Sequence, residues 1–228
     1  MTSPPQGADG EHPPSALFAS GLPAHAPPSL VVAWADAAWL DAVGPCLTAD
    51  EEAMAARLGA ARRAGFVLVR TLARRTVARA LGLDVRDVRI DKSDDGRPLL
   101  PTNKGWISLT HTTLGGRAVA GVALADVPVG LDVEPVRLRA PGLAARILAD
   151  GEALPAWPTT DDARLLAAWT AKEAALKADG LGLRQGAIAA RIAWGEGGAF
   201  TATTPGGRWA GQGVEAEGAV WAVAWATE

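Results

Sequence analysis

The stretch "VPVGLDVEPV", Val127–Val136, decides how the middle of this chain folds. Its valine- and leucine-rich composition predicts a buried β-strand. Residues two apart on a strand point to the same face, roughly 6.5 Å apart, so Asp132 and Glu134 share one side. Two carboxylates placed in this way suit a hard divalent cation such as Mg²⁺. Alternatively, the two side chains lie in water at the end of the strand. Val129, Leu131 and Val133 indicate that the opposite face of the strand packs in a core, which favours the cation site over the solvated strand end.

Short strands and longer helical segments alternate on both sides of this stretch. Apolar residues at strand-like spacing, separated by turn residues, predict strands at residues 29–35, 88–91, 106–112, 117–125, 187–194, 199–204, 207–215 and 219–226, with a hairpin turn at 195–198. Helical spacing predicts one or two helices over 48–82, and further helices over 141–150 and 161–180.

Capping residues mark the helix ends. Thr48 with Glu51 forms a capping box and Gly82 suits a C-terminal stop, and Thr159 with Asp162 and then Gly180 repeat the pattern. Strand, helix, strands, then helix and strands again indicate an α+β (α/β) fold in two halves. We expect a disordered Pro-rich tail over 1–28, an N-terminal half over 29–125 and a C-terminal half over 126–228.

The gross composition restricts the class of protein. A formal net charge of −3 over 228 residues argues against broad binding of nucleic acid. No apolar run is long enough to span a bilayer, and the N-terminus lacks a signal-peptide pattern, so we expect no membrane association. The single Cys46 fits a reducing, cytoplasmic location.

Three further stretches carry residues with chemical potential, and each has a simpler interpretation. Glu173 and Lys177 lie one turn apart on the helix over 161–180, either as a surface ion pair or as a metal ligand beside a phosphate-binding lysine. His111, beside Thr110, is either a structural histidine or a ligand of phosphate oxygens. Arg97, in the turn "DDGRP", is either solvated or a guanidinium fork for phosphate.

The motifs "GRP", "SLTHT", "VGLDVE" and "WTAKEAALK", in this order and spacing, resemble those of the Sfp-type 4′-phosphopantetheinyl transferases. The resemblance runs from about Leu47 to Leu183. It implies two similar α/β halves related by a pseudo-twofold, with coenzyme A bound between them. It also implies an Mg²⁺-dependent, holo-carrier-protein synthase type of enzyme. Such an enzyme transfers the 4′-phosphopantetheine arm to a serine of an acyl- or peptidyl-carrier protein and releases adenosine 3′,5′-bisphosphate.

The resemblance also assigns roles to residues. Asp132, Glu134 and Glu173 match the metal-binding positions, and Glu173 also matches the proposed general base. Asp132, Glu173 and Lys177 are thus the expected catalytic residues. The residues expected to contact coenzyme A are Arg97, Thr110, His111, Lys172, Lys177, Arg63 and Arg70. Which of the arginines at 57, 62, 63 and 70 reaches the 3′-phosphate stays open, because the spacing there is loose.

Two other classes of protein compete with this interpretation. A catalytically silent protein that binds coenzyme A would keep the fold without the reaction, and a structural α+β domain would carry the motifs by chance. Four ordered motifs, with every acidic and lysine position intact, favour the enzyme, which we expect to act as a monomer. Arg137, Arg139 and Arg146 follow the metal motif and are either solvated or a docking surface for an acidic carrier helix.

Overall fold

The structure is a computed structural model that describes residues 22–101, 105–137, 142–158, 160–180 and 186–227. The helices are α1 (Ala37–Val43), α2 (Ala49–Ala56), α3 (Ala60–Leu81), α4 (Leu143–Ile147) and α5 (Asp161–Asp179). The strands are β1 (Val31–Asp36), β2 (Asp91–Lys92), β3 (Pro98–Leu99), β4 (Trp106–Leu114), β5 (Arg117–Ala125), β6 (Val129–Pro135), β7 (Arg191–Trp194), β8 (Ala199–Thr204), β9 (Gly207–Ala216) and β10 (Ala219–Ala226).

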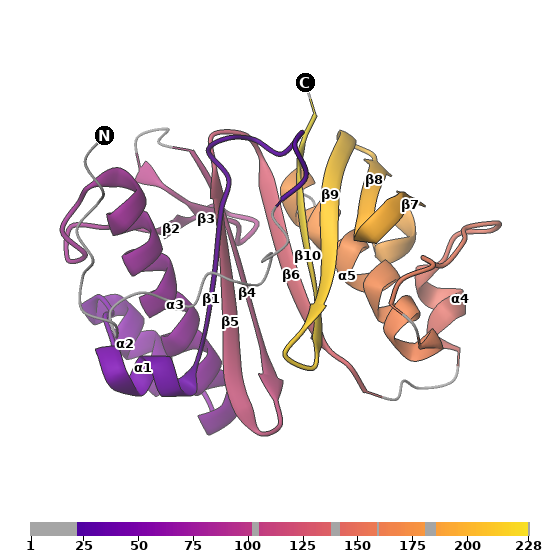
Figure 1. The fold of residues 1–228 in the computed structure, drawn as a ribbon. Helices are drawn as coiled ribbons and strands as arrows, with labels where there is room; N and C mark the ends of the chain where they lie inside the picture. The colour runs from indigo at the N-terminus through magenta and orange to yellow at the C-terminus, as the bar shows by residue number, and fades with distance from the viewer. Residues whose placement is uncertain (1–21, 102–104, 138–141, 159, 181–185, 228) are drawn as a thin grey trace, which may run out of the picture.

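Two antiparallel sheets form the centre of the molecule. One has the strand order β1-β5-β4 and the other β6-β10-β9-β8-β7, while β2 and β3 form a small hairpin. The two larger sheets meet where β4 lies beside β6, and α3 and α5 cover them on opposite sides of the molecule (Figure 1). Helices packed on antiparallel sheets confirm the predicted α+β class. The pseudo-twofold and the domain boundaries stay predictions.

Each long helix packs on its own sheet. Leu68 and Leu72 of α3 pack with Val122 of β5 in one core cluster. In α5, alanines occupy the face that meets the sheet, among them Ala171, Ala174, Ala175 and Ala178. They pack with Phe200 of β8 and Trp209 of β9 in a second core cluster. Small side chains let this helix lie close to the strands, and the distance between α5 and β6 determines the geometry of the site described below.

A third cluster joins the two sheets. Trp221 of β10 is fully buried beside Val119 and Val133, and its ring lies 6.3 Å from the Trp34 ring of β1. A Cβ at Gly121 would come within 2.7 Å of the Trp221 ring, so β5 can accept this indole only at a glycine. The boundary between the sheets is therefore a packed core, and it fixes β4 relative to β6.

Most of the local predictions hold. The Thr48–Glu51 capping box is present, and Gly82 and Gly180 end α3 and α5 in the left-handed conformation. The tail expected to be disordered differs over its described residues 22–28, because Leu22 and Ala26 pack against the core. The part of the chain that the structure describes contains no helix long and apolar enough to cross a membrane.

Four further local predictions differ from the structure, and the helix α1 was missed. Thr160, rather than Thr159, caps α5 by accepting the Ala163 N–H, and Thr159 lies outside the described residues. The strand expected at 88–91 is reduced to Asp91–Lys92, because the Val88 and Ile90 carbonyls accept arginine side chains. The start of the strand expected at 187–194 is a 3₁₀ turn, Ala187–Ala189. The helix expected over 141–150 covers only Leu143–Ile147, and α1 was not predicted.

Candidate active site

The predicted catalytic residues come together where α5 crosses β6. Asp132 lies on β6, and its Oδ1 accepts hydrogen bonds from Lys177 Nζ at 2.7 Å and from Thr110 Oγ1 at 3.1 Å. Glu173, one turn before Lys177 on α5, is close enough for the Asp132 charge to affect its pKa. The structure therefore joins one residue from the first sheet, one from the second sheet and two from a helix.

The alternation of β6 explains why Asp132 and Glu134 share a side. Leu131 and Val133 point away from α5, each into a different core cluster. Gly130 precedes Asp132 by two positions, and a Cβ there would meet the Ala174 carbonyl oxygen of α5, so this face of the strand looks toward the helix. The two carboxylates therefore lie under α5.

The backbone of β6 is fixed at the residue before Asp132. The Leu131 N–H donates to the buried Ser108 Oγ of β4 at 2.9 Å, and the Leu131 carbonyl accepts from Lys177 Nζ at 2.9 Å. These two contacts connect β4, β6 and α5 at one peptide. Ser108 was not predicted as a site residue; its place in "SLTHT", two residues before Thr110 on the same strand face, was the available signal.

Burial raises the pKa of both Asp132 and Glu173, and the Asp132 charge adds to the effect on Glu173. Burial raises the pKa of Asp132, and the Lys177 ammonium opposes this effect only in part. Burial, followed by the Asp132 charge, raises the pKa of Glu173 to about 7. Asp132 and Glu173 are only 7% and 3% exposed, so water relieves little of their repulsion.

Asp132, Glu134 and Glu173 form an acidic cluster, and two of its carboxylate oxygens lack a hydrogen-bond partner in the described part of the chain. Asp132 Oδ2 and Glu173 Oε1 are both buried, and neither has a hydrogen-bond partner among the residues that the structure describes. Leaving buried carboxylate oxygens unpaired is costly unless a cation or another donor binds to them. The cluster is thus suited to binding a positive charge between β6 and α5.

These oxygens fit Mg²⁺ in donor chemistry. Magnesium is commonly bound through one or two carboxylates, with waters and substrate phosphates completing the shell. Asp132 and Glu173 provide two such donors, whereas Glu134 Oε1 accepts the Trp169 indole N–H at 3.0 Å. Within the described parts of the chain, no group of three or more His, Cys, Asp or Glu residues is arranged as a metal site. The role of Glu134 as a metal ligand stays a prediction.

A pocket of about 280 Å³ lies next to His111 on β4. Desolvation lowers the pKa of the His111 imidazole, and the Lys177 charge lowers it further. Because Lys177 also donates to Asp132, the same lysine connects the His111 pocket with the acidic cluster. Two basic side chains, Arg62 of α3 and Arg137 after β6, also line the pocket, together with Thr112 and Thr113.

Among the α3 arginines proposed from the sequence, Arg62 is the one that lines the His111 pocket. Arg63 is exposed and does not belong to its described lining. A Cβ at Gly65 would lie 3.0 Å from His111 Nδ1, so α3 packs directly on the imidazole at this point. Of the four arginines left open by the sequence, Arg62 therefore lines this pocket, and which of them contacts coenzyme A stays a prediction.

Arg70, also expected to contact coenzyme A, lies in a buried ionic cluster. Its Nε donates to Glu51, its Nη2 donates to the Ile90 carbonyl at 2.7 Å, and Arg74 pairs with the same Glu51 at 3.0 Å. Burial would raise the pKa of Glu51, but the Thr48 N–H and the two arginines together lower it. Arg70 therefore connects α2, α3 and the segment before β2.

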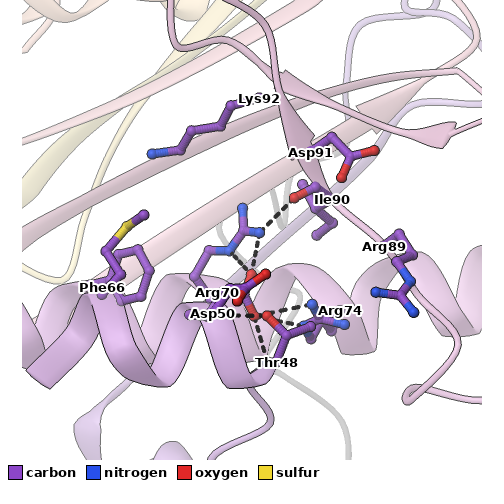
Figure 2. A pocket seen from close by; sticks show the side chains of 11 residues that line it. Thr48, Asp50, Phe66, Arg70, Arg74, Arg89, Ile90, Asp91 and Lys92 are labelled. Atoms are coloured by element: carbon purple, nitrogen blue, oxygen red, sulfur yellow. Dashed lines mark hydrogen bonds and ion pairs between the residues drawn. The ribbon is translucent and has the colours of Figure 1, made fainter.

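A second pocket, of about 220 Å³, opens beside this ionic cluster. Figure 2 shows Arg70 and Arg74 extending from α3 toward the Ile90 segment, with Lys92 above them. Arg70 Nη1 is buried and has no hydrogen-bond partner among the described residues. The remaining Arg70 nitrogens bind within the protein, and a contact of Arg70 with coenzyme A stays a prediction.

Lys172 also points away from the acidic cluster. It is fully buried, and its Nζ donates to Glu152 Oε2 at 2.6 Å and to the Ala190 carbonyl at 2.5 Å. Glu152 in turn accepts the Ile192 and Ala149 N–H groups at 2.7 and 2.9 Å. This network connects α5 to the segments around it, and we leave Lys172 out of the proposed site.

Arg97 reaches α5 from the other half of the molecule. Its guanidinium lies 4.2 Å from the centre of the Trp106 ring, and its Nη2 donates to the Ala178 carbonyl at 3.3 Å. Arg139, suggested as part of a docking surface, lies outside the described residues.

Comparison with known proteins bears on the C-terminal part of the chain. Residues 128–224 match the family model ACPS, described as the 4′-phosphopantetheinyl transferase superfamily. A search of curated proteins found no match. The matched stretch includes Asp132, Glu134, Glu173 and Lys177, the acidic cluster and its lysine. The similarity of residues 128–224 to this superfamily indicates a transferase that acts on phosphopantetheine in general terms.

Proposed function

We propose that this protein transfers the 4′-phosphopantetheine arm of coenzyme A to a serine hydroxyl of an acyl- or peptidyl-carrier protein. The reaction is Mg²⁺-dependent, converts the apo carrier to the holo carrier and releases adenosine 3′,5′-bisphosphate. One observation carries the proposal: Asp132, Glu173 and Lys177 converge, with two buried carboxylate oxygens that lack a partner in the described residues.

The chemistry requires charge to be controlled on a diphosphate. The serine Oγ forms a bond to the phosphorus that carries the pantetheine arm, and the bond from that phosphorus to the bridging oxygen breaks. The bridging oxygen leaves with adenosine 3′,5′-bisphosphate and bears the developing negative charge. Catalysis of such a step depends mainly on positioning and on electrostatic stabilisation.

The chain provides groups for each part of this step. Asp132 and Glu173 would hold Mg²⁺, which polarises the diphosphate and neutralises its charge. Lys177, held at 2.7 Å from Asp132, directs an ammonium at the same place and can donate to a phosphate oxygen. The Glu173 carboxylate oxygen that does not bind the metal can accept the serine proton directly or through one water.

The pocket beside His111 supports coenzyme A as the donor. Arg62, Arg137 and His111 place basic groups around a volume of about 280 Å³ in a chain with a net charge of −3. A local basic pocket can bind phosphates even when the whole protein is acidic, because nearby groups dominate the field there. We therefore assign phosphate groups of coenzyme A to this pocket.

The test measures the product directly. The protein is incubated with coenzyme A, Mg²⁺ and an apo carrier protein, and the carrier is weighed by mass spectrometry. We expect a gain of one phosphopantetheine, which disappears when a chelator removes the metal and is unaffected by Glu215→Gln, an exposed carboxylate on β9. No gain with any of several carriers would refute the enzyme, and binding of coenzyme A alone would then indicate the silent relative.

A further inference from the structure

Arg97 connects two parts of the molecule that are distant in sequence. Its backbone is fixed in the turn between β2 and β3, where its N–H donates to Ser93 Oγ at 3.0 Å and its carbonyl accepts the Ser93 N–H at 2.9 Å. From this turn the side chain extends to the C-terminal end of α5. A fixed turn therefore presents a guanidinium to the helix that carries Lys177 and Glu173.

Two contacts fix the guanidinium itself. The Trp106 ring, at the start of β4, lies under it at 4.2 Å, a geometry in which the ring face attracts a cation. Its Nη2 donates to the Ala178 carbonyl at 3.3 Å, in the last turn of α5. The C-terminal end of a helix carries partial negative charge, so an arginine is favourable at this position.

The residue that Arg97 contacts adjoins the site. Ala178 directly follows Lys177, whose Nζ donates to both Asp132 and the Leu131 carbonyl. In the same turn, Asp179 accepts the Gly206 N–H at 3.1 Å. The last turn of α5 is thus held both by Arg97 and by the turn between β8 and β9.

We propose that Arg97 is a positioning residue, which acts on phosphopantetheine transfer by holding the last turn of α5, and therefore Lys177, against β6. The inference rests on the proposed function for its kinetic consequence. It assigns Arg97 a different role from a direct contact with coenzyme A, because the guanidinium lies over the Trp106 ring and its Nη2 is bonded to the helix end.

Hydrogen exchange tests the positioning role without reference to activity. In Arg97→Gln, we expect the amides of residues 176–180 to exchange on the order of tenfold faster, as for the loss of one hydrogen bond to a charged group. Trp106→Leu, which keeps the arginine but removes its platform, should have the same direction of effect. Arg208→Gln, an exposed arginine on β9, is the matched control and should leave these amides unchanged. Unchanged exchange in folded Arg97→Gln would overturn the proposal.

Kinetics separates positioning from binding. In Arg97→Gln we expect kcat to fall about tenfold, since a displacement of about 1 Å can cost up to about 100-fold, while KM for coenzyme A stays within about twofold. Arg97→Lys keeps the charge but loses the planar fork, so we expect it to restore little of kcat. A raised KM with unchanged kcat, or full rescue by lysine, would overturn the proposal. If the wild-type protein modifies no carrier, the proposed function fails, and the exchange measurement alone decides the role of Arg97.

Discussion

Gly130 is the position at which a single methyl group should most strongly disturb the site. A Cβ there would lie 1.9 Å from the Ala174 carbonyl oxygen and 2.6 Å from the Ala178 backbone nitrogen, both in α5. Cβ atoms essentially never approach other heavy atoms closer than 3.0 Å, so Gly130→Ala requires a displacement of about 1.1 Å, the difference between 3.0 and 1.9 Å. The new Cβ would clash with backbone atoms of α5, so no side-chain rotation can relieve the clash.

The displacement acts directly on the proposed catalytic residues. Ala174 follows Glu173 and Ala178 follows Lys177, so a shift of α5 away from β6 moves both groups relative to Asp132. The Lys177–Asp132 hydrogen bond, 2.7 Å long, would then exceed hydrogen-bonding distance. We expect the rate of carrier modification to fall about 100-fold, the loss associated with a misplacement of about 1 Å. The free energy of unfolding should fall by about 1–3 kcal/mol, as for other overpacked cores.

Two measurements and one control test this reasoning. Carrier modification is followed by mass spectrometry, and stability by urea unfolding. Gly195→Ala is the matched control, because its Cβ would meet Ala199 at an ordinary 3.5 Å and the backbone φ of Gly195 is −107°. If Gly130→Ala retains wild-type stability, the close approach of α5 to β6 is wrong. If it loses stability but keeps full activity, the spacing does not control the site.

The remaining predictions concern the two ionic clusters. Asp132→Ala should abolish transfer while circular dichroism stays native, because the site loses a ligand and relieves a charge repulsion; an active variant would place the metal site elsewhere. Lys177→Ala should slow transfer. In urea unfolding it should reduce stability less in an Asp132→Asn background than in the wild type, since removing the cation alone leaves a buried charge unpaired. Strict additivity of the two substitutions would contradict an interaction between Lys177 and Asp132. Because Arg70 and Arg74 help to lower the pKa of Glu51 below 4.5, the stability that it contributes should be present above this pH and lost as pH falls through the lowered value. Glu51→Gln should reduce that loss, as measured by unfolding across this pH range, and an unchanged pH profile would argue against the pairing.

The elements of the fold follow largely from local patterns, and their arrangement does not. Alternation and apolar runs identified β4, β5, β6 and β8–β10, because a strand face is visible in the sequence. The short helix α1 was missed although Asp36 caps it by accepting the Trp39 N–H, since the strand pattern before it continues into apolar residues. The boundary between the sheets depends on Trp221 meeting Gly121, a contact across about half of the chain that no local pattern encodes.

The same limit explains which side-chain partners the sequence could predict. Spacing on α5 gives the neighbours of Lys177 on its own helix, so Glu173 was the natural partner to expect for a surface pair. The structure instead pairs Lys177 with Asp132, which lies across the interface between helix and strand. Lys172 behaves likewise, because its partner Glu152 comes from the segment after α4. A cation's partner is determined by tertiary packing, whereas its position on a helix face is determined by the sequence.

The stretch Val127–Val136 shows how a local pattern can carry tertiary information. Gly130, Asp132 and Glu134 occupy alternate positions and therefore one face of β6. The missing side chain at Gly130 lets the α5 backbone approach the strand, and that approach buries Asp132 beneath the helix beside Glu173. Close packing and a cluster of buried acids are thus one arrangement, since a bulkier residue at Gly130 would separate the carboxylates and admit water. Gly130 therefore contributes to the chemistry by setting the distance between Asp132 on β6 and Glu173 on α5.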